Sequence, residues 1–259
     1  MKKIISTILT ILTCCGCLMA QQARFTVSGT IEFEKTVNTY ALIRKGQVTG
    51  KFATGNEREL LEQYQVTNPQ FKTLKSTLTF AGGKTLFIPV DREAIKGQGF
   101  EIPTSAQNNT IYTDRAAGTV TTQKDVFGDN FLLSDSTRKI KWKITGETRE
   151  IAGYPCRRAN GLMMDSVYIV AFFTEKIHIA GGPESFGGLP GMILEVALPH
   201  ENITWKATKV TDIIVAPDAI KPPKNGKAID RTRLLEILNG IIKIRPAAQA
   251  ALIMKANLL

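Results

Sequence analysis

The sequence predicts a mainly β protein of the α+β class, in which a curved antiparallel β-meander, or half-barrel, is covered by a C-terminal helical segment. Two observations support this prediction. From residue 23 to residue 210, short stretches rich in β-branched and aromatic residues recur between turn signals containing Gly, Asn and Asp. After a Pro-rich linker at residues 216–227, apolar residues recur at helical spacing instead. We therefore expect a β domain at residues 21–227 and a helical segment at residues 228–259.

The chain begins with a segment that is not expected to belong to the fold. Residues 1–20 have the features of a secretory signal peptide: two lysines, an apolar stretch at residues 4–19, and Ala20 as a small residue at the cleavage point. A lipoprotein signal is the alternative, because Cys17 follows Gly16. It is less favoured, since Cys14 stands where a lipidation site has a branched apolar residue. We expect secretion across the inner membrane, to the periplasm or the cell surface.

Cleavage after Ala20 would leave Cys156 as the one cysteine of the mature chain, so that no intramolecular disulfide could form. A buried, small apolar side chain is the favoured interpretation of Cys156. The alternative is a reactive thiol, because Arg157 and Arg158 could lower its pKa.

The elements of the β domain follow in order along the chain. Residues 56–66 predict one short helix, with Asn56 as its N-cap. Two glycines at residues 82–83, between alternating segments, predict a hairpin. Strands are predicted at or within residues 23–37, 76–80, 85–90, 109–136, 139–179, 192–198 and 202–210.

The C-terminal segment predicts a helix with one apolar face, formed by Leu234, Leu238 and Ile241, and a break or kink at Pro246. The favoured interpretation is a helix that covers the open face of the sheet. The alternative is a basic amphipathic helix that makes peripheral contact with a membrane surface.

The stretch FGGLPGMILEV at residues 186–196 contains the most distinctive motif, formed by Gly187, Gly188, Leu189, Pro190 and Gly191. Phosphate-binding loops usually lead into a helix, whereas this one leads into the predicted strand at residues 192–198. We therefore interpret the motif as a structural corner, with a type II turn at residues 189–192, rather than as a ligand-binding loop.

Several segments resemble the GLPGLI family of secreted Bacteroidota proteins. The resemblance rests on FGGLPGMILEV, on IKWKITGETREIAGYPCRRA and on FFTEKIHIAGGPESF, and it covers roughly residues 110–215. The sequence departs from the family pattern at Met192 and at Phe172 and Phe173. The resemblance implies a secreted protein with a curved antiparallel sheet, similar to periplasmic lipoprotein carriers, and it implies no particular activity.

Composition and motifs favour a binding protein over an enzyme. The formal net charge is +10, but no run of Lys and Arg exceeds two residues, which argues against a nucleic-acid partner. The motifs G-x-S-x-G, H-E-x-x-H, G-x-G-x-x-G and the P-loop do not occur. We expect a non-enzymatic carrier with no cofactor, whose concave face binds a lipid, a peptide or an envelope protein. The candidate lining residues are Tyr154, Cys156, Phe172 and Met192.

Two alternatives remain open from the sequence. A secreted hydrolase could use a pair of carboxylates from distant positions. A periplasmic copper-handling protein could combine His178 or His200 with Cys156 and with Met163, Met164 or Met192. No spacing in the sequence requires either of them, and no metal-ligating residue is assigned.

Overall fold

The computed structural model describes residues 25–50, 56–90, 101–164 and 166–258, so the predicted signal peptide lies outside the described residues. The described residues form one twelve-stranded sheet in the order β12-β6-β5-β4-β3-β2-β1-β11-β10-β9-β8-β7. This arrangement confirms the predicted mainly β fold and its antiparallel meander. The strands are β1 (Ser28–Asn38), β2 (Phe71–Ala81), β3 (Lys84–Pro89), β4 (Thr110–Asp114), β5 (Thr119–Val126), β6 (Asp129–Ser136), β7 (Lys141–Ile151), β8 (Tyr154–Met163), β9 (Val167–Thr174), β10 (Met192–Leu198), β11 (Ile203–Asp212) and β12 (Lys227–Asp230).

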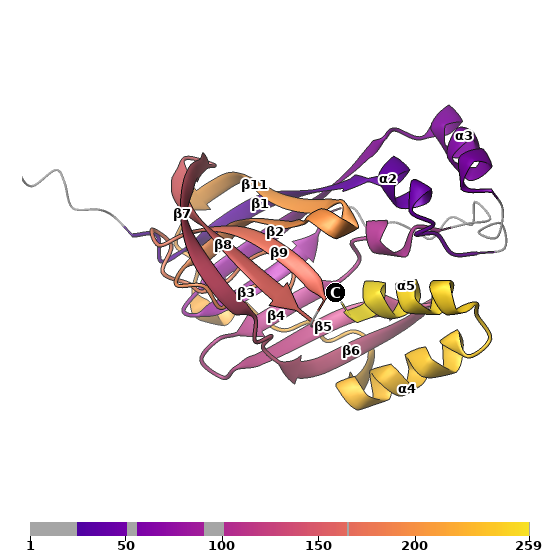
Figure 1. The fold of residues 1–259 in the computed structure, drawn as a ribbon. Coiled ribbons are helices and arrows are strands. Elements are labelled where there is room, and N and C mark those ends of the chain that lie inside the picture. Colours follow the sequence, from indigo (N-terminus) through magenta and orange to yellow (C-terminus); the bar gives the residue numbers. More distant parts are fainter. Residues whose placement is uncertain (1–24, 51–55, 91–100, 165, 259) are drawn as a thin grey trace, which may run out of the picture.

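The sheet consists of two meanders that join at β1. Strands β2 to β6 follow one another on one side of β1, and strands β7 to β11 follow one another on its other side. β1 pairs antiparallel with both β2 and β11. Strong curvature gives the sheet a concave inner face (Figure 1). The turn between β2 and β3 confirms the predicted hairpin, and Gly82 and Gly83 both adopt positive φ there.

Alternation along the strands determines what faces the interior. In β1, Ile31, Phe33 and Val37 are buried, whereas the residues between them are partly or fully exposed, apart from Lys35. The period of two directs these side chains to the same face, where they join the main hydrophobic core. Lys35 lies at an inward position in the same series, which places a cation among apolar side chains.

Two short helices, α2 (Thr39–Arg44) and α3 (Glu57–Thr67), extend from one end of β1 and β2 (Figure 1). The sequence predicted a helix at residues 56–66, and α3 lies there. The side chain of Asn56 accepts a hydrogen bond from the backbone N–H of Arg58, as expected of an N-cap.

The C-terminal segment differs in part from its prediction. It begins with a strand, β12, which pairs parallel with β6, and only then forms α4 (Arg231–Ile242) and α5 (Ala247–Leu258). Four residues are too few for a period of two to be recognised, so the sequence signal was dominated by the helix that follows. Helix α4 packs on β6 and β12 through Leu234 and Leu238. The helices therefore cover one end of the sheet rather than its whole open face.

The connection between β9 and β10, residues 175–191, fills much of the remaining inner face. Its side chains Ile177, Phe186 and Leu189 are buried in the main core. The ring of Phe186 lies 5.7 Å from that of Trp205 on β11, centroid to centroid. The Nε1–H of Trp142 on β7 donates a hydrogen bond to the carbonyl of Gly187 at 3.0 Å. This connection therefore ties the edge strand β7 to the interior of the curved sheet.

The prediction of a type II turn at residues 189–192 was wrong. The N–H of Gly191 donates to the carbonyl of Leu189 at 2.8 Å, and the N–H of Met192 donates to Ile177 at 3.2 Å instead of closing the turn. Gly191 has φ 148°. A Cβ at this position would collide with the carbonyl oxygen of Thr174 on β9. Close approach of a neighbouring strand, rather than turn geometry, explains the glycine.

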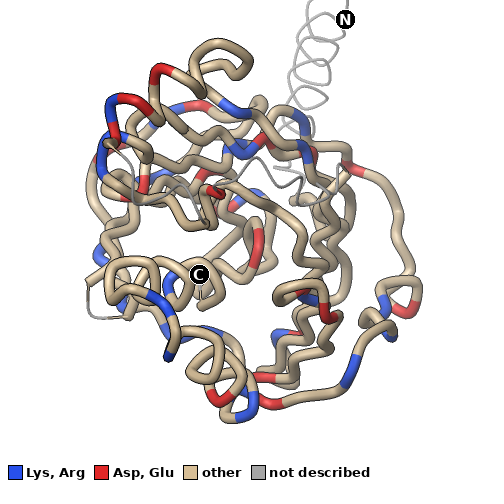
Figure 2. Tube along the Cα trace, turned by 90° about the vertical axis from the view of Figure 1, so that its right-hand side faces the viewer, with Lys and Arg blue, Asp and Glu red and all other residues tan. Residues whose placement is uncertain are grey.

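Among the described residues, no helix is both long and apolar enough to cross a membrane. Lys and Arg are spread over the chain and interleaved with Asp and Glu (Figure 2).

Candidate functional site

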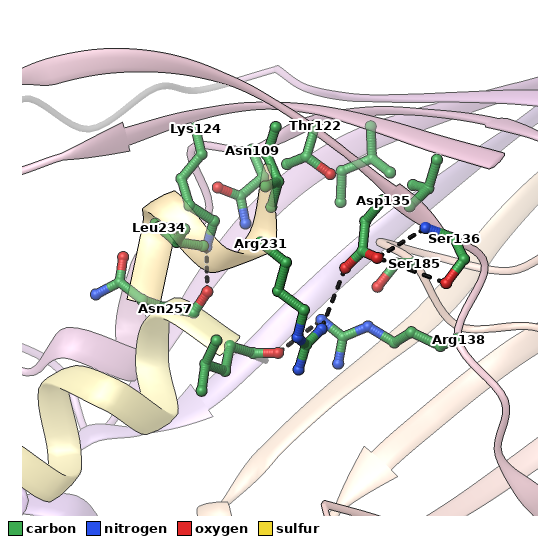
Figure 3. A pocket seen from close by; sticks show the side chains of 14 residues that line it. Asn109, Thr122, Lys124, Asp135, Ser136, Arg138, Ser185, Arg231, Leu234 and Asn257 are labelled. Atoms are coloured by element: carbon green, nitrogen blue, oxygen red, sulfur yellow. Dashed lines mark hydrogen bonds and ion pairs between the residues drawn. The ribbon is translucent and has the colours of Figure 1, made fainter. Parts of the chain in front are cut away.

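A polar pocket lies on the inner face, where β4, β5 and β6 meet α4 and the end of α5 (Figure 3). It is a small cavity of about 50 Å³ that is partly open to solvent. The lining residues are Asn109, Ile111, Val120, Thr122, Lys124, Leu133, Asp135, Ser136, Arg138, Ser185, Arg231, Leu234, Asn257 and Leu258. Of the polar ones, Thr122, Lys124, Asp135 and Ser136 project from strands, which hold them more rigidly than a loop would.

Strand register brings the central lining residues together. Val120, Thr122 and Lys124 occupy alternate positions of β5 and so face the same side. Thr122 pairs with Leu133 of β6, and Val120 pairs with Asp135. The pocket floor is therefore a patch of β-sheet in which apolar and polar side chains alternate.

Lys124 is the most deeply buried cation of the pocket, with 7% of its surface exposed. Its ammonium group donates a hydrogen bond to the backbone carbonyl of Asn257, near the end of α5, at 2.9 Å. Burial lowers the pKa of Lys124 to about 8, although the nearby carboxylate of Glu184 acts in the opposite direction. The lysine is therefore held by a helix end and by one buried acidic group.

Arg138 is the second cation that binds the end of α5. Its Nη2 donates to the carbonyl of Leu258 at 2.7 Å, and its Nη1 contacts the sulfur of Met163 at 3.0 Å. Burial lowers the pKa of Arg138, and the positive charge of Arg231 lowers it further. Figure 3 shows the guanidinium groups of Arg138 and Arg231 close to each other beside Asp135.

Glu184 is the buried carboxylate next to these cations. Only 9% of its surface is exposed, and its backbone has φ 50°, a left-handed conformation that residues other than glycine rarely adopt. Burial raises the pKa of Glu184, whereas Lys35, Lys124 and Arg138 oppose this rise. Such a strained and buried acidic residue requires a surrounding structure that compensates for it, and it is often found at functional sites.

Lys35 extends the charged cluster away from the pocket. Its ammonium group donates to the carbonyls of Thr104 at 3.0 Å and Ala106 at 2.6 Å, and it lies 5.0 Å from the centre of the Trp205 ring. The Nε1–H of Trp205 donates to the side-chain oxygen of Gln107 at 3.0 Å. These contacts hold Lys35 against the segment around η2 (Pro103–Ser105), at a position from which its charge acts on the buried carboxylate of Glu184.

The mouth of the pocket carries an ion pair. Asp135 of β6 accepts a hydrogen bond from Arg231, the first residue of α4, at 3.1 Å. Asp135 also accepts from the backbone N–H of Ser136 at 2.7 Å. The pocket and its immediate surroundings thus combine three cations, Lys124, Arg138 and Arg231, with two carboxylates, Asp135 and Glu184.

The four lining residues predicted from the sequence lie elsewhere in the structure, and none of them lines this pocket. Cys156 is 1% exposed, and burial raises its pKa to about 12. The guanidinium carbon of Arg149 lies 3.4 Å from the centre of the Phe172 ring. Met192 is completely buried. The hydroxyl of Tyr154 is hydrogen-bonded to that of Thr26 at 3.2 Å.

The glycine-rich motif contributes little to the pocket. Of the connection that contains it, Ser185 lines the pocket, whereas residues 187–191 do not. Gly187 accepts from Trp142, and a Cβ there would collide with the side chain of Arg115. These contacts are compatible with the predicted role as a structural corner.

Neither of the open alternatives gains support from side-chain positions. Within the described part of the chain, no group of three or more His, Cys, Asp or Glu side chains is arranged to hold a metal ion. His178 stacks on Phe25, with ring centroids 4.1 Å apart, and His200 lies near Tyr168. Of the two carboxylates at the pocket, Asp135 is paired with Arg231 and Glu184 is enclosed among cations.

Sequence reasoning missed the charged residues that define the pocket. Lys35 on β1 and Lys124 on β5 each lie two residues from inward-facing side chains of the same strand. The alternation of inward and outward residues could therefore have identified both lysines as buried. Glu184 and Arg138 lie outside regular strands, where no periodicity indicates which side chains are buried.

Comparison with known proteins relates the pocket-bearing part of the chain to one family. Residues 107–233, just under half of the chain, match the family model described as the N-terminal domain of the N-glycanase peptide, PNGase F-II. This segment includes all of the lining residues except Leu234, Asn257 and Leu258. A comparison with curated protein sequences found no match.

Solved structures with a similar fold include PNGF-II in two crystal forms. The P21 form is 19% identical with a TM-score of 0.47, covering 81% of this chain and 33% of that chain. The C2 form is 17% identical with a TM-score of 0.48, covering 88% and 33%. An uncharacterised conserved protein from Thermus thermophilus is 6% identical with a TM-score of 0.40, covering 85% and 99%. The chain thus spans about a third of the length of the PNGF-II chains.

Proposed function

We propose that this chain is a secreted, non-enzymatic binding protein of the cell envelope whose polar pocket binds a carbohydrate. The observation that carries this proposal is the lining of the pocket. Thr122 and Ser185 offer hydroxyl groups around a floor that also contains apolar side chains. Asn109 and Ser136 add an amide and a hydroxyl group, which are also hydrogen-bonded to Glu184 and Asp135. Hydroxyl-rich ligands need such closely spaced donors and acceptors, with a small apolar surface for the ring.

The matched family supports the carbohydrate part of the proposal. That family is named for an N-glycanase, and the matching segment carries most of the pocket lining. The predicted signal peptide and the GLPGLI resemblance support the secreted part, at the periplasm or the cell surface. An envelope protein that carries a glycan is a partner compatible with both.

A carbohydrate replaces the hydrophobic ligand expected from the sequence. The apolar part of the inner face is packed with the protein's own side chains, among them Phe186 and Leu189. A lipid chain would have to displace this core, whereas the small pocket at β4, β5 and β6 has a lining in which polar and apolar side chains are mixed. Closely packed interiors leave no such space without rearrangement.

The proposal of a non-enzymatic role rests on the two carboxylates. A glycosidase needs one carboxylic acid that donates a proton and one carboxylate that attacks or activates water. Asp135 is held by Arg231 at 3.1 Å, and Glu184 is shut among Lys35, Lys124 and Arg138. Both carboxylates therefore compensate the charges of neighbouring cations, which favours a structural role over catalysis.

A glycan array followed by calorimetric titration of the purified protein tests the proposal. We expect at least one array glycan to bind, and Thr122→Val or Ser185→Ala to weaken its binding by roughly 5- to 10-fold each, because each change removes one hydrogen-bonding group. Thr148→Val, on the exposed edge strand β7, is the matched control and should leave binding unchanged. Binding to no glycan, or binding that ignores both pocket variants, would contradict the proposed function.

A further inference from the structure

We propose that the protein binds the lipid surface of the cell envelope through the end of the sheet at which β1 begins and β11 ends. The contact surface, which we call the apolar tip, consists of Phe25, Val27, Ile213 and Ile214. The proposal rests on the secreted part of the proposed function, because the predicted signal peptide is the reason why this end lies near a membrane. It adds an interaction surface that is separate from the polar pocket.

The apolar tip exposes large side chains that proteins usually bury. Ile214 is 99% exposed, the largest fraction of any large apolar side chain in the described part of the chain, and Val27 is 66% exposed. Ile213 and Phe25 are also exposed. Single exposed apolar residues are common on protein surfaces, whereas several that adjoin one another mark an interaction site.

A hydrogen bond holds the two segments of the apolar tip side by side. The hydroxyl of Ser28 donates to the carbonyl of Ile213 at 2.7 Å. Counting on by two residues from the last pair of the β1–β11 ladder places Val27 opposite Ile214. Side chains directly opposite each other on antiparallel segments point to the same face and lie close together. Val27 and Ile214 therefore form one continuous surface.

Phe25 is held beside the same surface. The N–H of Thr26 donates to the carbonyl of Lys176 at 3.0 Å, and Thr26 is buried, whereas Phe25 and Val27 on either side of it are exposed. This alternation places Phe25 and Val27 on the same side of the chain. The ammonium group of Lys176 lies 5.5 Å from the centre of the Phe25 ring. A lysine next to exposed apolar side chains suits the boundary between acyl chains and lipid phosphates.

The place of the apolar tip in the chain indicates that a membrane covers it. Phe25 lies five residues after the predicted cleavage point at Ala20 and eight residues after Cys17, the alternative site of lipidation. Eight extended residues span at most about 29 Å. The segment that is expected to enter the membrane is therefore joined to the tip by a short connection. A lipid anchor at Cys17 would hold the tip against the bilayer, and cleavage after Ala20 would leave it as a peripheral contact.

This surface differs from the C-terminal helix that the sequence offered as a membrane contact. The apolar tip lies at the beginning of β1, whereas α2 follows the other end of this strand. In Figure 1 the beginning of β1 is on the left, and α4 and α5 are on the right. Ile244, between Lys243 and Arg245, is the single large apolar side chain of residues 231–258 that is fully exposed to a comparable degree, at 85%. The apolar tip offers a larger apolar surface.

Vesicle binding tests the proposal with the protein expressed from residue 21. We expect this protein to sediment with vesicles of phosphatidylethanolamine and phosphatidylglycerol in equal parts. The double variant Val27→Ser/Ile214→Ser should weaken the binding by roughly 10-fold or more, because it removes two apolar side chains from the contact. Val66→Ser on α3 and Ile244→Ser are the matched controls, since both side chains are highly exposed elsewhere. Both controls should bind as the wild type does, and all variants should retain its circular dichroism.

Fluorescence quenching by brominated lipids locates the contact independently. We expect Ile214→Trp to show additional fluorescence that vesicles containing brominated lipid quench. Val66→Trp is the control, and its additional fluorescence should not be quenched. Equal quenching of the two variants would contradict a contact at the apolar tip.

Four results of the sedimentation experiment would overturn the proposal. They are failure of the wild type to bind the vesicles, unchanged binding of the double variant, an equal loss in all variants, and a loss confined to Ile244→Ser, which would move the contact to the C-terminal helices. Dimerisation of the wild type that the double variant abolishes, without vesicle binding, would show that a second copy of the chain covers the tip instead. The double variant should bind glycans as the wild type does, so failure of vesicle binding would leave the proposed carbohydrate binding intact.

Discussion

Lys124 shows how one buried residue links the sheet to the function proposed here. Its position on β5 is inward, in phase with Val120 and Thr122, so the strand that builds the core also delivers a cation to the pocket. A charged lysine in such surroundings is costly unless it is compensated. The carbonyl of Asn257 and the carboxylate of Glu184 provide that compensation.

The lowered pKa of Lys124 predicts a pH dependence of stability. Its pKa is 10.5 in the unfolded reference and about 8 in the folded protein. Between these values the unfolded chain binds more protons, so the free energy of unfolding contributed by this group rises with pH. We expect the wild type to gain roughly 1–3 kcal/mol relative to Lys124→Met between about pH 7.5 and pH 10. Urea denaturation of both proteins at the two pH values measures this, and a difference that stays constant with pH would contradict it.

Cys156 gives a second prediction at the scale of a residue. The sequence left open a thiol activated by Arg157 and Arg158, but burial raises the pKa of Cys156 to about 12. The thiol is therefore protonated and inaccessible at neutral pH. In a protein expressed from residue 21, which retains Cys156 but lacks Cys14, Cys15 and Cys17, we expect no reaction with a thiol reagent such as DTNB in the folded state at about pH 8, and full reaction in urea. Rapid labelling of the folded protein would show that the thiol of Cys156 is accessible to solvent, which would contradict the prediction.

At the scale of elements, the turn before β10 illustrates what local sequence could not determine. The motif was interpreted as a corner, and the type of turn predicted for it was wrong. The N–H of Met192 binds Ile177, and Gly191 packs against Thr174; these contacts are set by β9 and by the connection that follows it. A Pro-Gly pair in the sequence predicts that the backbone bends. It does not predict which hydrogen bonds form there, because these depend on the neighbouring strand.

This geometry predicts a large effect of a small substitution. Gly191→Ala would place a methyl group against the carbonyl of Thr174 at a φ of 148°, and we expect the free energy of unfolding to fall by roughly 2–4 kcal/mol. Gly146→Ala is the matched control, because nothing lies within 4 Å of its added Cβ. Chemical denaturation of the two variants should separate them clearly. Similar small losses for both would mean that the strand can shift to admit the methyl group.

At the scale of the whole molecule, the sequence predicted the class of fold and the order of most elements, but it predicted neither the pairing that joins the two meanders nor the pocket. Strands with clear alternation, such as those of the β2–β3 hairpin, were predictable because their signal is local. The pairing of β1 with β11 joins residues far apart in the sequence. The pocket depends on that pairing and on contacts between β5 and α5, so no local pattern could reveal it.

The position of β1 between the two meanders predicts that the sheet unfolds as one unit. Phe33 of β1 is buried and pairs with Ser76 of β2 and Ala207 of β11. Phe33→Ala should lower the free energy of unfolding by roughly 3–5 kcal/mol, because it leaves a cavity at the seam. Tryptophan fluorescence reports the second meander, through Trp142 on β7 and Trp205 on β11, whereas far-ultraviolet circular dichroism reports the whole sheet. We expect both midpoints to shift together and to coincide before and after the substitution. The contrary result would be a fluorescence midpoint that does not shift in Phe33→Ala, together with a circular dichroism transition that splits into two. It would show that the two meanders unfold independently, and that β1 stabilises the first meander alone.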